Sequence, residues 1–235
     1  MEFGFFNMDC MDGLKELPDQ SIDLAIVDPP YGGGTSDDAE ETYNGAIVGR
    51  FGGRFQSYLE KDKRGHMGGG HAKRYGYGHW DKRPSKEYFD ELFRVSKNQI
   101  IWGGNYFSLP PTRCFLIWEK LTISENFSMA MAEYAWASFN DNAKIFKFAP
   151  QGKGDRFHPT QKPIELYEWV LNKYAKPGDI ILDTHVGSAS SLIACRNTGH
   201  KYIGYEINEF YYEKAKKRLE DAEAQMNIFD YGYME

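Results

Sequence analysis

The sequence predicts an α/β fold built on a mostly parallel, twisted sheet with helices on both faces. Short apolar runs recur along the chain and alternate with segments of helical period, the pattern of α/β domains. Several runs end abruptly at an acidic residue or a glycine, and in open α/β sheets the carboxyl ends of strands are where ligands bind. The 235 residues suffice for a single domain, 1–235, with a buried core.

Composition narrows the class of protein. No apolar stretch approaches the roughly 20 residues that span a bilayer, and the first four residues lack the basic start of a signal peptide, so we expect no membrane partner and a cytoplasmic location. Cys10, Cys114 and Cys195 are far apart and predict reduced, mostly buried thiols. The formal net charge of −6 argues mildly against a nucleic-acid partner, but the charge is unevenly distributed.

The first half begins with a strand predicted within residues 3–8 and a helical turn at 14–17. The next apolar run, 24–27, stops at Asp28-Pro29-Pro30-Tyr31. Two prolines cannot extend a strand ladder, so Asp28 is expected at a strand tip, where its carboxylate and the proline carbonyls accept hydrogen bonds. Such acceptors suit an NH₂ group, and Tyr31 offers a flat face to a planar base. A surface Pro-Pro turn is the alternative.

Residues 32–83 have little periodicity and many glycines, and we interpret them as an inserted region that contacts DNA. Residues 50–83 contain nine basic and three acidic side chains, a net charge of +6 that leaves −12 for the rest of the chain. Basic and aromatic residues alternate with glycine, as in segments that follow phosphates and stack on bases. A solvated loop is the alternative. The candidate DNA-binding residues are Arg50, Arg54, Lys63, Arg64, Lys73, Arg74, Lys82 and Arg83.

The middle of the chain continues the sheet. A helix capped by Ser85 is predicted to run to about Val95, followed by a strand at 99–102 that ends in Gly103-Gly104-Asn105. Strands at 114–118 and 134–139, the latter the last of this half, flank a short helix at 126–133. Residues 140–157 are expected to be a polar, basic connection that touches a phosphate backbone or serves as a plain linker.

The second half contains a Rossmann-like unit. Pro163 begins a helix that ends before Pro177, and the preceding segment 158–162 brings Thr160 to a helix N-terminus, where a carboxylate can bind. A buried strand at 179–183 leads through a turn containing Gly187 to a helix at 190–197. A second strand, 202–205, ends at Glu206, at the spacing expected of an acidic residue that holds ribose hydroxyls, and a closing helix spans 209–224.

Four motifs occur in a telling order: Asp28-Pro29-Pro30-Tyr31, His158-Pro159-Thr160-Gln161-Lys162-Pro163, Asp183-Thr184-His185-Val186-Gly187-Ser188 and Gly204-Tyr205-Glu206. This order resembles the permuted beta class of S-adenosylmethionine-dependent DNA amino-methyltransferases, in which the catalytic half precedes the cofactor half. The resemblance extends from Asp9 to about Arg218. It implies a Rossmann-like methyltransferase fold with circularly permuted motifs.

The resemblance also implies roles for individual residues. The residues implied to be catalytic are Asp28, Pro29, Pro30 and Tyr31. The residues implied to bind S-adenosylmethionine are Asp9, His158, Thr160, Lys162, Asp183, His185, Gly187, Ser188 and Glu206. By the residues alone, Asp9 could equally be a helix cap. The chain departs from the family pattern at His185, where an aromatic residue is usual, and at Ala189, where a second glycine is usual.

The activity implied is site-specific methylation of the N6 amine of adenine in double-stranded DNA after base flipping, in a restriction–modification setting and without a metal. Asp28 favours adenine because the family's cytosine enzymes more often carry Ser there. The alternatives are a cytosine-N4 methyltransferase and a non-catalytic module that binds DNA or senses S-adenosylmethionine. The sequence does not determine which DNA sequence is recognised. A homodimer is possible, but the sequence does not determine the oligomeric state.

Overall fold

The computed structural model describes residues 1–31, 83–126, 130–149, 156–158 and 160–231, with side chains up to residue 224. The chain divides into two compact units. One unit comprises Met1–Pro29 and Glu87–Glu235, and the other is Pro30–Lys86, most of which lies outside the described residues. The fold below is that of the first unit.

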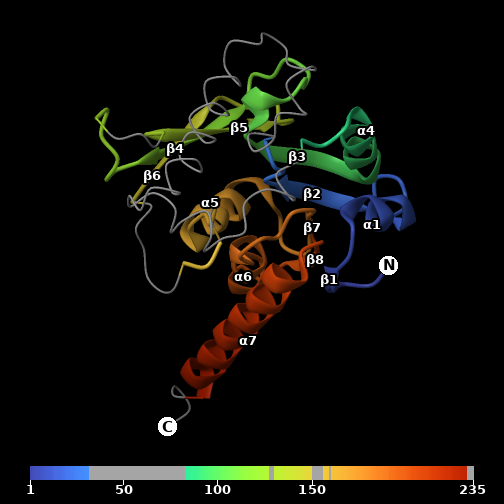
Figure 1. The fold of residues 1–235 in the computed structure, drawn as a ribbon, viewed down its shortest axis with the longest axis vertical. Helices are drawn as coiled ribbons and strands as arrows, with labels where there is room; N and C mark the ends of the chain where they lie inside the picture. The colour runs from blue at the N-terminus through green and yellow to red at the C-terminus, as the bar shows by residue number, and fades with distance from the viewer. Residues whose placement is uncertain (32–82, 127–129, 150–155, 159, 232–235) are drawn as a thin grey trace, which may run out of the picture. The chain divides into compact units, whose positions relative to one another are not determined.

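The sheet of the described residues has eight strands in the order β1-β8-β7-β2-β3-β5-β4-β6 (Figure 1). Only β5 runs antiparallel to its neighbours, so the prediction of a mostly parallel sheet is confirmed. The strands are β1 (Gly4–Asn7), β2 (Ile22–Val27), β3 (Ser96–Trp102), β4 (Phe115–Lys120), β5 (Ala132–Ala137), β6 (Lys144–Phe148), β7 (Ile180–Asp183) and β8 (Lys201–Glu206).

Helices cover both faces of the sheet (Figure 1). The helices are α1 (Cys10–Glu16), α4 (Lys86–Val95), the short 3₁₀-helix Gly104–Tyr106, α5 (Ile164–Tyr174), α6 (Ser190–Asn197) and α7 (Glu209–Tyr231). Helices α1 and α4 pack on one face, α5 and α6 on the other, and α7 packs against α6 through a smaller cluster. None of the helices in the described part of the chain combines the length and hydrophobicity that a membrane span requires.

Strand β2 contributes side chains to both hydrophobic clusters of the core, one on each face of the sheet. Its side chains alternate in direction, so Leu24 and Ile26 pack toward α5, while Ala25 and Val27 pack toward α1 and α4. A strand covered on both faces needs apolar residues at every position, which explains the continuous apolar run read from the sequence. The buried strand brings Asp28 to the carboxyl edge of the sheet.

Three predictions for the middle of the chain were wrong. Residues 140–157 are not only a connection, because Lys144–Phe148 forms the edge strand β6, and 134–139 is therefore not the last strand of this half. The described residues between β4 and β5 form no helix. Strand β6 escaped notice because lysines stand at two of its five positions, a pattern common on sheet edges, where charges discourage pairing with other chains.

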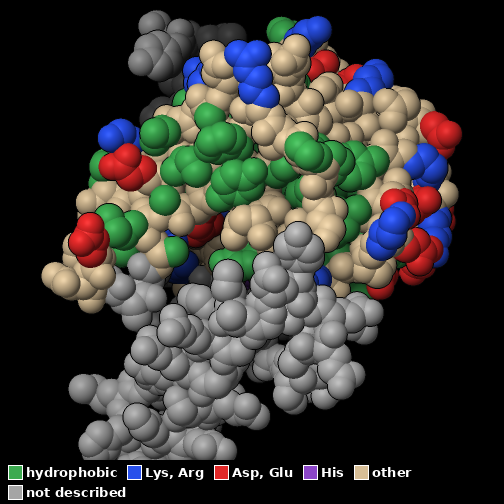
Figure 2. Space-filling model, turned by 90° about the horizontal axis from the view of Figure 1, so that it is seen from above, with side chains coloured by type: hydrophobic (Ala, Val, Ile, Leu, Met, Phe, Trp, Pro, Cys, Tyr) green, Lys and Arg blue, Asp and Glu red, His purple; other side chains and the backbone are tan. Residues whose placement is uncertain are grey.

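Strands β4 and β6 present an apolar face on the side away from α5. Leu116 and Trp118 point into the core with α5, whereas Phe115 and Ile117 point to the opposite side and stay partly exposed. Next to Ile117 across the parallel pair, Ile145 is 59% exposed. Figure 2, which looks onto the molecule from above in the orientation of Figure 1, shows apolar side chains gathered on this side.

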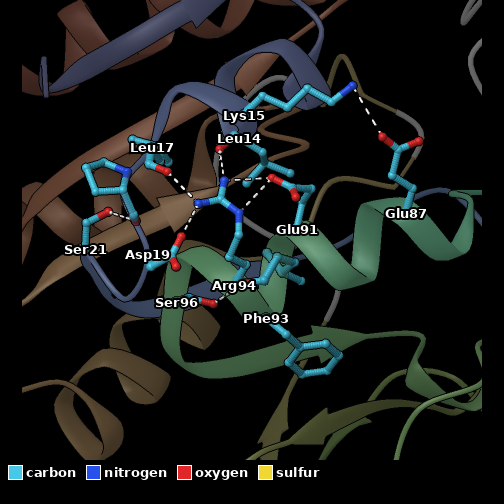
Figure 3. A network of polar contacts seen from close by, with 12 residues as sticks. Leu14, Lys15, Leu17, Asp19, Ser21, Glu87, Glu91, Phe93, Arg94 and Ser96 are labelled. Carbon is cyan, nitrogen blue, oxygen red and sulfur yellow. Dashed lines mark hydrogen bonds and ion pairs between the residues drawn. The ribbon is translucent and has the colours of Figure 1, made fainter.

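Arg94, in the last turn of α4, joins that helix to the end of α1 (Figure 3). Its guanidinium donates to the carbonyl oxygens of Leu14 and Leu17, both at 2.9 Å, and pairs with Asp19 at 2.6 Å. Carbonyls at a helix C-terminus often lack partners within the helix. Arg94 supplies a donor to the carbonyl of Leu17 and a second donor to that of Leu14, which also accepts from the N–H of Leu17 at 3.1 Å. A contact within α4, to Glu91 at 2.7 Å, holds the guanidinium in place.

We expect the variant Arg94→Lys to lose about 1–2 kcal/mol of unfolding free energy, because a single ammonium cannot reproduce the planar fork that reaches both carbonyls. The matched control is Lys15→Ala, which removes an exposed ion pair to Glu87 between the same two helices, with side chains 56% and 65% exposed. Exposed pairs contribute little, so this control should lose less than about 0.5 kcal/mol. Urea unfolding of both variants measures the difference, and equal losses would contradict the anchoring role of Arg94.

Candidate active site

Acidic residues from both halves of the chain meet at one edge of the sheet. Strands β2, β7 and β8 are parallel, so their carboxyl ends share an edge, where Asp28 follows β2, Asp183 ends β7 and Glu206 ends β8. The carboxyl end of β4, with Lys120, and the amino end of the antiparallel β5, with Glu133, reach the same edge. The site therefore combines residues that the sequence keeps more than 170 positions apart.

Asp28 is paired with a buried ammonium. Lys162, in the segment before α5, has a side chain only 3% exposed, and its Nζ contacts Oδ2 of Asp28. The same Nζ lies 3.1 Å from Oε2 of Glu133 and 5.5 Å from the ring centroid of Trp102. The sequence places Lys162 among the cofactor residues, whereas the structure joins it to the predicted catalytic carboxylate.

The charges continue beyond Lys162. Oε1 of Glu133 lies 2.6 Å from Nζ of Lys120, so Asp28, Lys162, Glu133 and Lys120 form a row of alternating charge. Burial by itself lowers the pKa of Lys162, but the carboxylates of Asp28 and Glu133 outweigh burial and raise it above its ordinary value. Burial likewise raises the pKa of Glu133, and the two lysines more than reverse this. Both side chains are therefore charged at neutral pH.

Asp183 is held by its own turn. Its Oδ1 accepts from the backbone N–H of His185 at 3.0 Å, and its Oδ2 accepts from the hydroxyl of Ser191 in α6. Complete burial raises the pKa of Asp183 to about 7, against the opposing effect of these two hydrogen bonds. The carboxylates of Asp28 and Glu206 raise it further. A positively charged group placed beside Asp183 would relieve this strain on its charged form.

Glu206 links the end of β8 to the turn after β7. Its Oε2 accepts from the backbone N–H of Gly187 and its Oε1 from that of Asn208, both at 2.9 Å. Burial raises the pKa of Glu206, although these N–H groups counter the effect. The carboxylate is thus fixed in direction by backbone groups on either side of it.

The turn at Gly187 packs against His158. Gly187 has φ of +56°, and a Cβ atom there would lie 3.1 Å from the imidazole ring, so both the backbone and the contact favour glycine. The ring of His158 is buried, lies 4.5 Å from that of Tyr211 between centroids, and contacts the Thr160 hydroxyl through Nδ1 at 3.2 Å. Burial lowers the pKa of His158 to about 3, so the imidazole is neutral.

Ser188 and Ala189 of the turn are also buried, whereas His185 is partly exposed. Ala189 is the N-cap residue of α6 and has φ of +63°, the left-handed conformation in which the family's usual glycine costs no strain. Ser188 lies before it, and its carbonyl accepts from Arg218 of α7 at 2.6 Å. His185 contacts the hydroxyl of Thr184 through Nδ1 at 2.9 Å, and burial lowers its pKa to about 4.

Other predicted site residues are placed less directly. Asp9 caps α1 by accepting from the N–H of Met11 at 2.8 Å, the alternative that the sequence left open. Pro29 is buried directly after Asp28, while Pro30, Tyr31 and Arg83 belong to the second unit. The other candidate DNA-binding residues lie outside the described residues: Arg50, Arg54, Lys63, Arg64, Lys73, Arg74 and Lys82. Among the described residues, no cluster of His, Cys, Asp and Glu could hold a metal ion.

Comparison with known proteins identifies the family. The family described as DNA methylase, with N6 and N4 amino-methyltransferase activity in its name, matches residues 56–217. The chain belongs to this family. The methylase is 27% identical over 244 residues to the Type II methyltransferase M.HpaI of Haemophilus parainfluenzae, covering 92% of the chain and 73% of that protein. It is also 36% identical over 66 residues to the putative methylase YubD of Escherichia coli K12, covering 28% and 29% of the two.

Solved structures share the fold of the methylase. The M1.HpyAVI complex with S-adenosylmethionine matches with a TM-score of 0.54 and 18% identity, covering 92% of this chain and all of that one. The cytosine-N4-specific PvuII DNA methyltransferase matches with a TM-score of 0.57 and 11% identity, covering 93% and 90%. The predictions of a Rossmann-like methyltransferase fold and of an S-adenosylmethionine-dependent DNA amino-methyltransferase family are confirmed.

Sequence reasoning missed Glu133, Lys120 and Trp102. All three lie on strands that reach the edge with Asp28, but on the side of β2 away from the cofactor half. No motif marks them, and their placement depends on the pairing of β3 with β5 and of β5 with β4. The sequence signals were the strand tip Gly103-Gly104-Asn105 directly after Trp102 and the apolar run of β4 ending in the charged pair Glu119-Lys120.

The raised pKa of Asp183 predicts a pH-dependent contribution to stability. In the unfolded chain the pKa is about 4, so between about 4 and 7 the folded state binds more protons, and stability is lost as pH rises through this range. The variant Asp183→Asn mimics the protonated form. Urea unfolding from pH 5 to 8 should show the wild type losing stability relative to this variant as pH rises, with no further change above 8.

The matched control is Asp23→Asn. Burial acts to raise the pKa of Asp23, but hydrogen bonds from Lys97 at 2.6 Å and from the N–H of Ile180 at 2.9 Å lower it below the ordinary value. Its contribution is therefore present above the unfolded pKa of about 4 and lost as pH falls below that value. The difference between wild type and this control should stay constant from pH 5 to 8. A constant difference for Asp183→Asn as well would show that its pKa is not raised.

Proposed function

We propose that the methylase transfers the methyl group of S-adenosylmethionine to the exocyclic N6 amine of adenine in DNA. The observation that carries this proposal is the position of Asp28, an acceptor at the carboxyl end of β2, next to the strand that ends in Asp183. Oδ2 of Asp28 contacts the buried ammonium of Lys162. A carboxylate only accepts hydrogen bonds, which suits an amine that donates two N–H groups and loses one proton on methylation.

The residues beside Asp28 fit the cofactor. The carboxyl groups of Asp183 and Glu206 suit the amino group and ribose hydroxyls of S-adenosylmethionine, and the turn at Gly187 brings backbone between them. The buried amide oxygen of Gln161 has no donor among the described residues, so an acceptor remains for a ligand. Bound there, S-adenosylmethionine supplies an electrophilic methyl group. Asp9, His158, Thr160, His185 and Ser188 stay proposed cofactor contacts.

The residues around the tetrapeptide would then orient the base. Asp28 and the carbonyl of Pro29 accept hydrogen bonds from the two N–H groups of the adenine amine, which turns the nitrogen lone pair away from both and toward the methyl group. The nitrogen displaces the sulfur of S-adenosylmethionine from the methyl group and then releases one proton. The base must leave the DNA stack to reach Asp28, and Tyr31 is proposed to stack on it. Positioning and electrostatics supply the rate, and the contact with Lys162 holds the carboxylate of Asp28 in place.

Adenine is proposed over cytosine because an aspartate stands at the first position of the tetrapeptide. The likeness to the cytosine-N4-specific PvuII enzyme, at 11% identity, concerns the fold. Mass spectrometry of nucleosides from DNA treated with the methylase distinguishes the two products. Calorimetry with S-adenosylmethionine tests the non-catalytic alternative, since absence of binding would rule out both enzymatic functions.

The variant Asp28→Ala should reduce methyl transfer to DNA by about 100-fold or more, since it removes an acceptor aimed at the reacting amine. Cofactor affinity measured by calorimetry should persist, because Asp183 and Glu206 are unchanged. The matched control is Asp23→Asn, at the opposite end of the same strand, which should methylate as the wild type does. Full activity of Asp28→Ala would refute the role of Asp28.

We further propose that residues 50–83 are the main DNA clamp, on the strength of their net charge of +6 within an acidic chain. By contrast, two lysines of the 140–157 region have acidic partners: Lys144 pairs with Asp141 at 3.1 Å and Lys147 with Glu119 at 3.0 Å. Their charges are partly neutralised within the protein. The region 50–83 therefore offers the larger unbalanced positive charge for a phosphate backbone.

Replacing Arg64, Lys73 and Arg74 with Ala should flatten the plot of log affinity for DNA against log salt by roughly 0.9 for each phosphate that the variant no longer neutralises. Cofactor affinity, measured separately by calorimetry, should not change. The variant Lys147→Ala is the control and should keep the wild-type slope. If the triple variant keeps its slope and the control does not, the clamp lies in the 140–157 region instead.

A further inference from the structure

The row of charges behind Asp28 includes two residues that no motif contains. The row, defined as Asp28, Lys162, Glu133 and Lys120, crosses four segments: the end of β2, the segment before α5, and strands β5 and β4. Lys120 is buried, and Glu133 is partly buried beside Trp118, its partner across the β4–β5 pair. The row carries two positive and two negative charges and is neutral as a whole.

Neutrality of the row depends on Glu133. Lys162 is a single ammonium between two carboxylates, with Oδ2 of Asp28 on one side and Oε2 of Glu133, at 3.1 Å, on the other. Charges removed from water interact strongly, so each carboxylate limits how far Lys162 neutralises the other. Without Glu133, two buried ammonium groups would remain with Asp28 as their one carboxylate in the row. The ion pair between Lys162 and Asp28 would then be stronger, and the carboxylate of Asp28 would be less available to another donor.

The ring of Trp102 provides a third contact for the ammonium group of Lys162. Its centroid lies 5.5 Å from Nζ of Lys162, within the range of a cation–π contact. Trp102 is completely buried and belongs to the core cluster under α5. The ammonium therefore has a defined place between two carboxylates and an aromatic ring, and it cannot follow Asp28 without leaving Glu133.

We propose that Glu133 is a positioning residue for methyl transfer, acting through Lys162 to keep the carboxylate of Asp28 available to the substrate amine. This inference rests on the proposed function of Asp28. Glu133 divides the charge of Lys162 between two carboxylates, and Lys120 in turn balances Glu133. The strands β4 and β5, which lie outside the cofactor half, thereby take part in the chemistry at β2.

The effect should appear in the pH profile above neutrality. Other titratable groups that interact with the row are Tyr88 of α4, Tyr167 of α5, Asp183 of β7 and His158 before α5. Burial raises the pKa values of Tyr88 and Tyr167 well above their ordinary value, that of Asp183 is about 7, and that of His158 is about 3. None of these four groups should titrate between pH 8 and 10, so a change there reports the row itself.

The test is methyl transfer from radiolabelled S-adenosylmethionine to DNA by the full chain carrying Glu133→Gln. Orienting groups one step behind a reacting group typically contribute 10- to 100-fold, so kcat should fall by about that factor. Cofactor affinity should stay as in the wild type. Because Lys162 loses one carboxylate, its pKa should fall, and the alkaline limb of kcat against pH should move to lower pH.

Two further variants separate charge from structure. Glu119→Gln, on β4 next to Lys120 but paired with Lys147, is the matched control and should keep both kcat and the alkaline limb. The double variant Lys120→Met with Glu133→Gln restores neutrality to the row as one Asp28–Lys162 pair. Its kcat should recover part of the loss seen in Glu133→Gln, whereas a residue needed only for packing would give a double variant worse than the single one.

The outcomes distinguish the inference from the function beneath it. If the wild type transfers no methyl group to DNA, the proposed function fails and the inference fails with it. If the wild type is active and Glu133→Gln matches it in kcat and pH profile, only the inference is overturned. If Glu133→Gln melts far below the wild type, the double variant decides: recovery of kcat supports the charge role, and no recovery overturns it.

Discussion

The active edge depends on one ion pair between distant parts of the chain, that of Lys162 with Asp28. An ammonium buried in the protein interior needs carboxylate partners, because leaving it unpaired would cost several kcal/mol. Lys162 can reach its partners only when the segment before α5 packs over the ends of β2 and β5. The pair therefore links the correct assembly of the two halves to the position of the carboxylate proposed to receive the substrate amine.

The cofactor side of the edge is organised by backbone hydrogen bonds instead of ion pairs. Glu206 accepts from the N–H groups of Gly187 and Asn208, and Asp183 accepts from that of His185. Each carboxyl group is thus oriented by the turn beside it, which pre-organises the acceptors before a ligand binds. Arg218, from α7, completes this arrangement by holding the carbonyl of Ser188. The long last helix therefore stabilises the turn as well as covering α6.

The charged groups on the two sides of β2 are consequently stabilised in different ways. Toward β7 and β8 the side chains lie in short turns, and burial raises the pKa values of Asp183 and Glu206. Toward β3, β5 and β4 the row of alternating charge holds Lys162 and Glu133 ionised. Asp28 stands between them, and its charge also acts on Asp183. The family's order of motifs, with the catalytic half first, places this boundary at β2.

The sequence alone was sufficient for features that depend on local order. Continuous apolar runs identified β2, β3, β7 and β8, and the residues that end three of them, Asp28, Asp183 and Glu206, lie at a common edge because the strands are parallel. The helix predicted at 190–197 has these bounds in the structure. The family followed from motifs that each occupy a few consecutive residues.

Only the tertiary structure decided which distant residues meet. The antiparallel insertion of β5 between β3 and β4 brings Glu133 and Lys120 to the edge. The alternation of residues along a strand predicts the strand but not which strands pair with it. The tertiary structure also revealed strand β6, whose two lysines obscure its apolar pattern, and the packing of the His158 ring against Gly187. Lys162 was recognised from its motif but not its partner, because a charge is read from one residue and its pairing depends on how the whole chain packs.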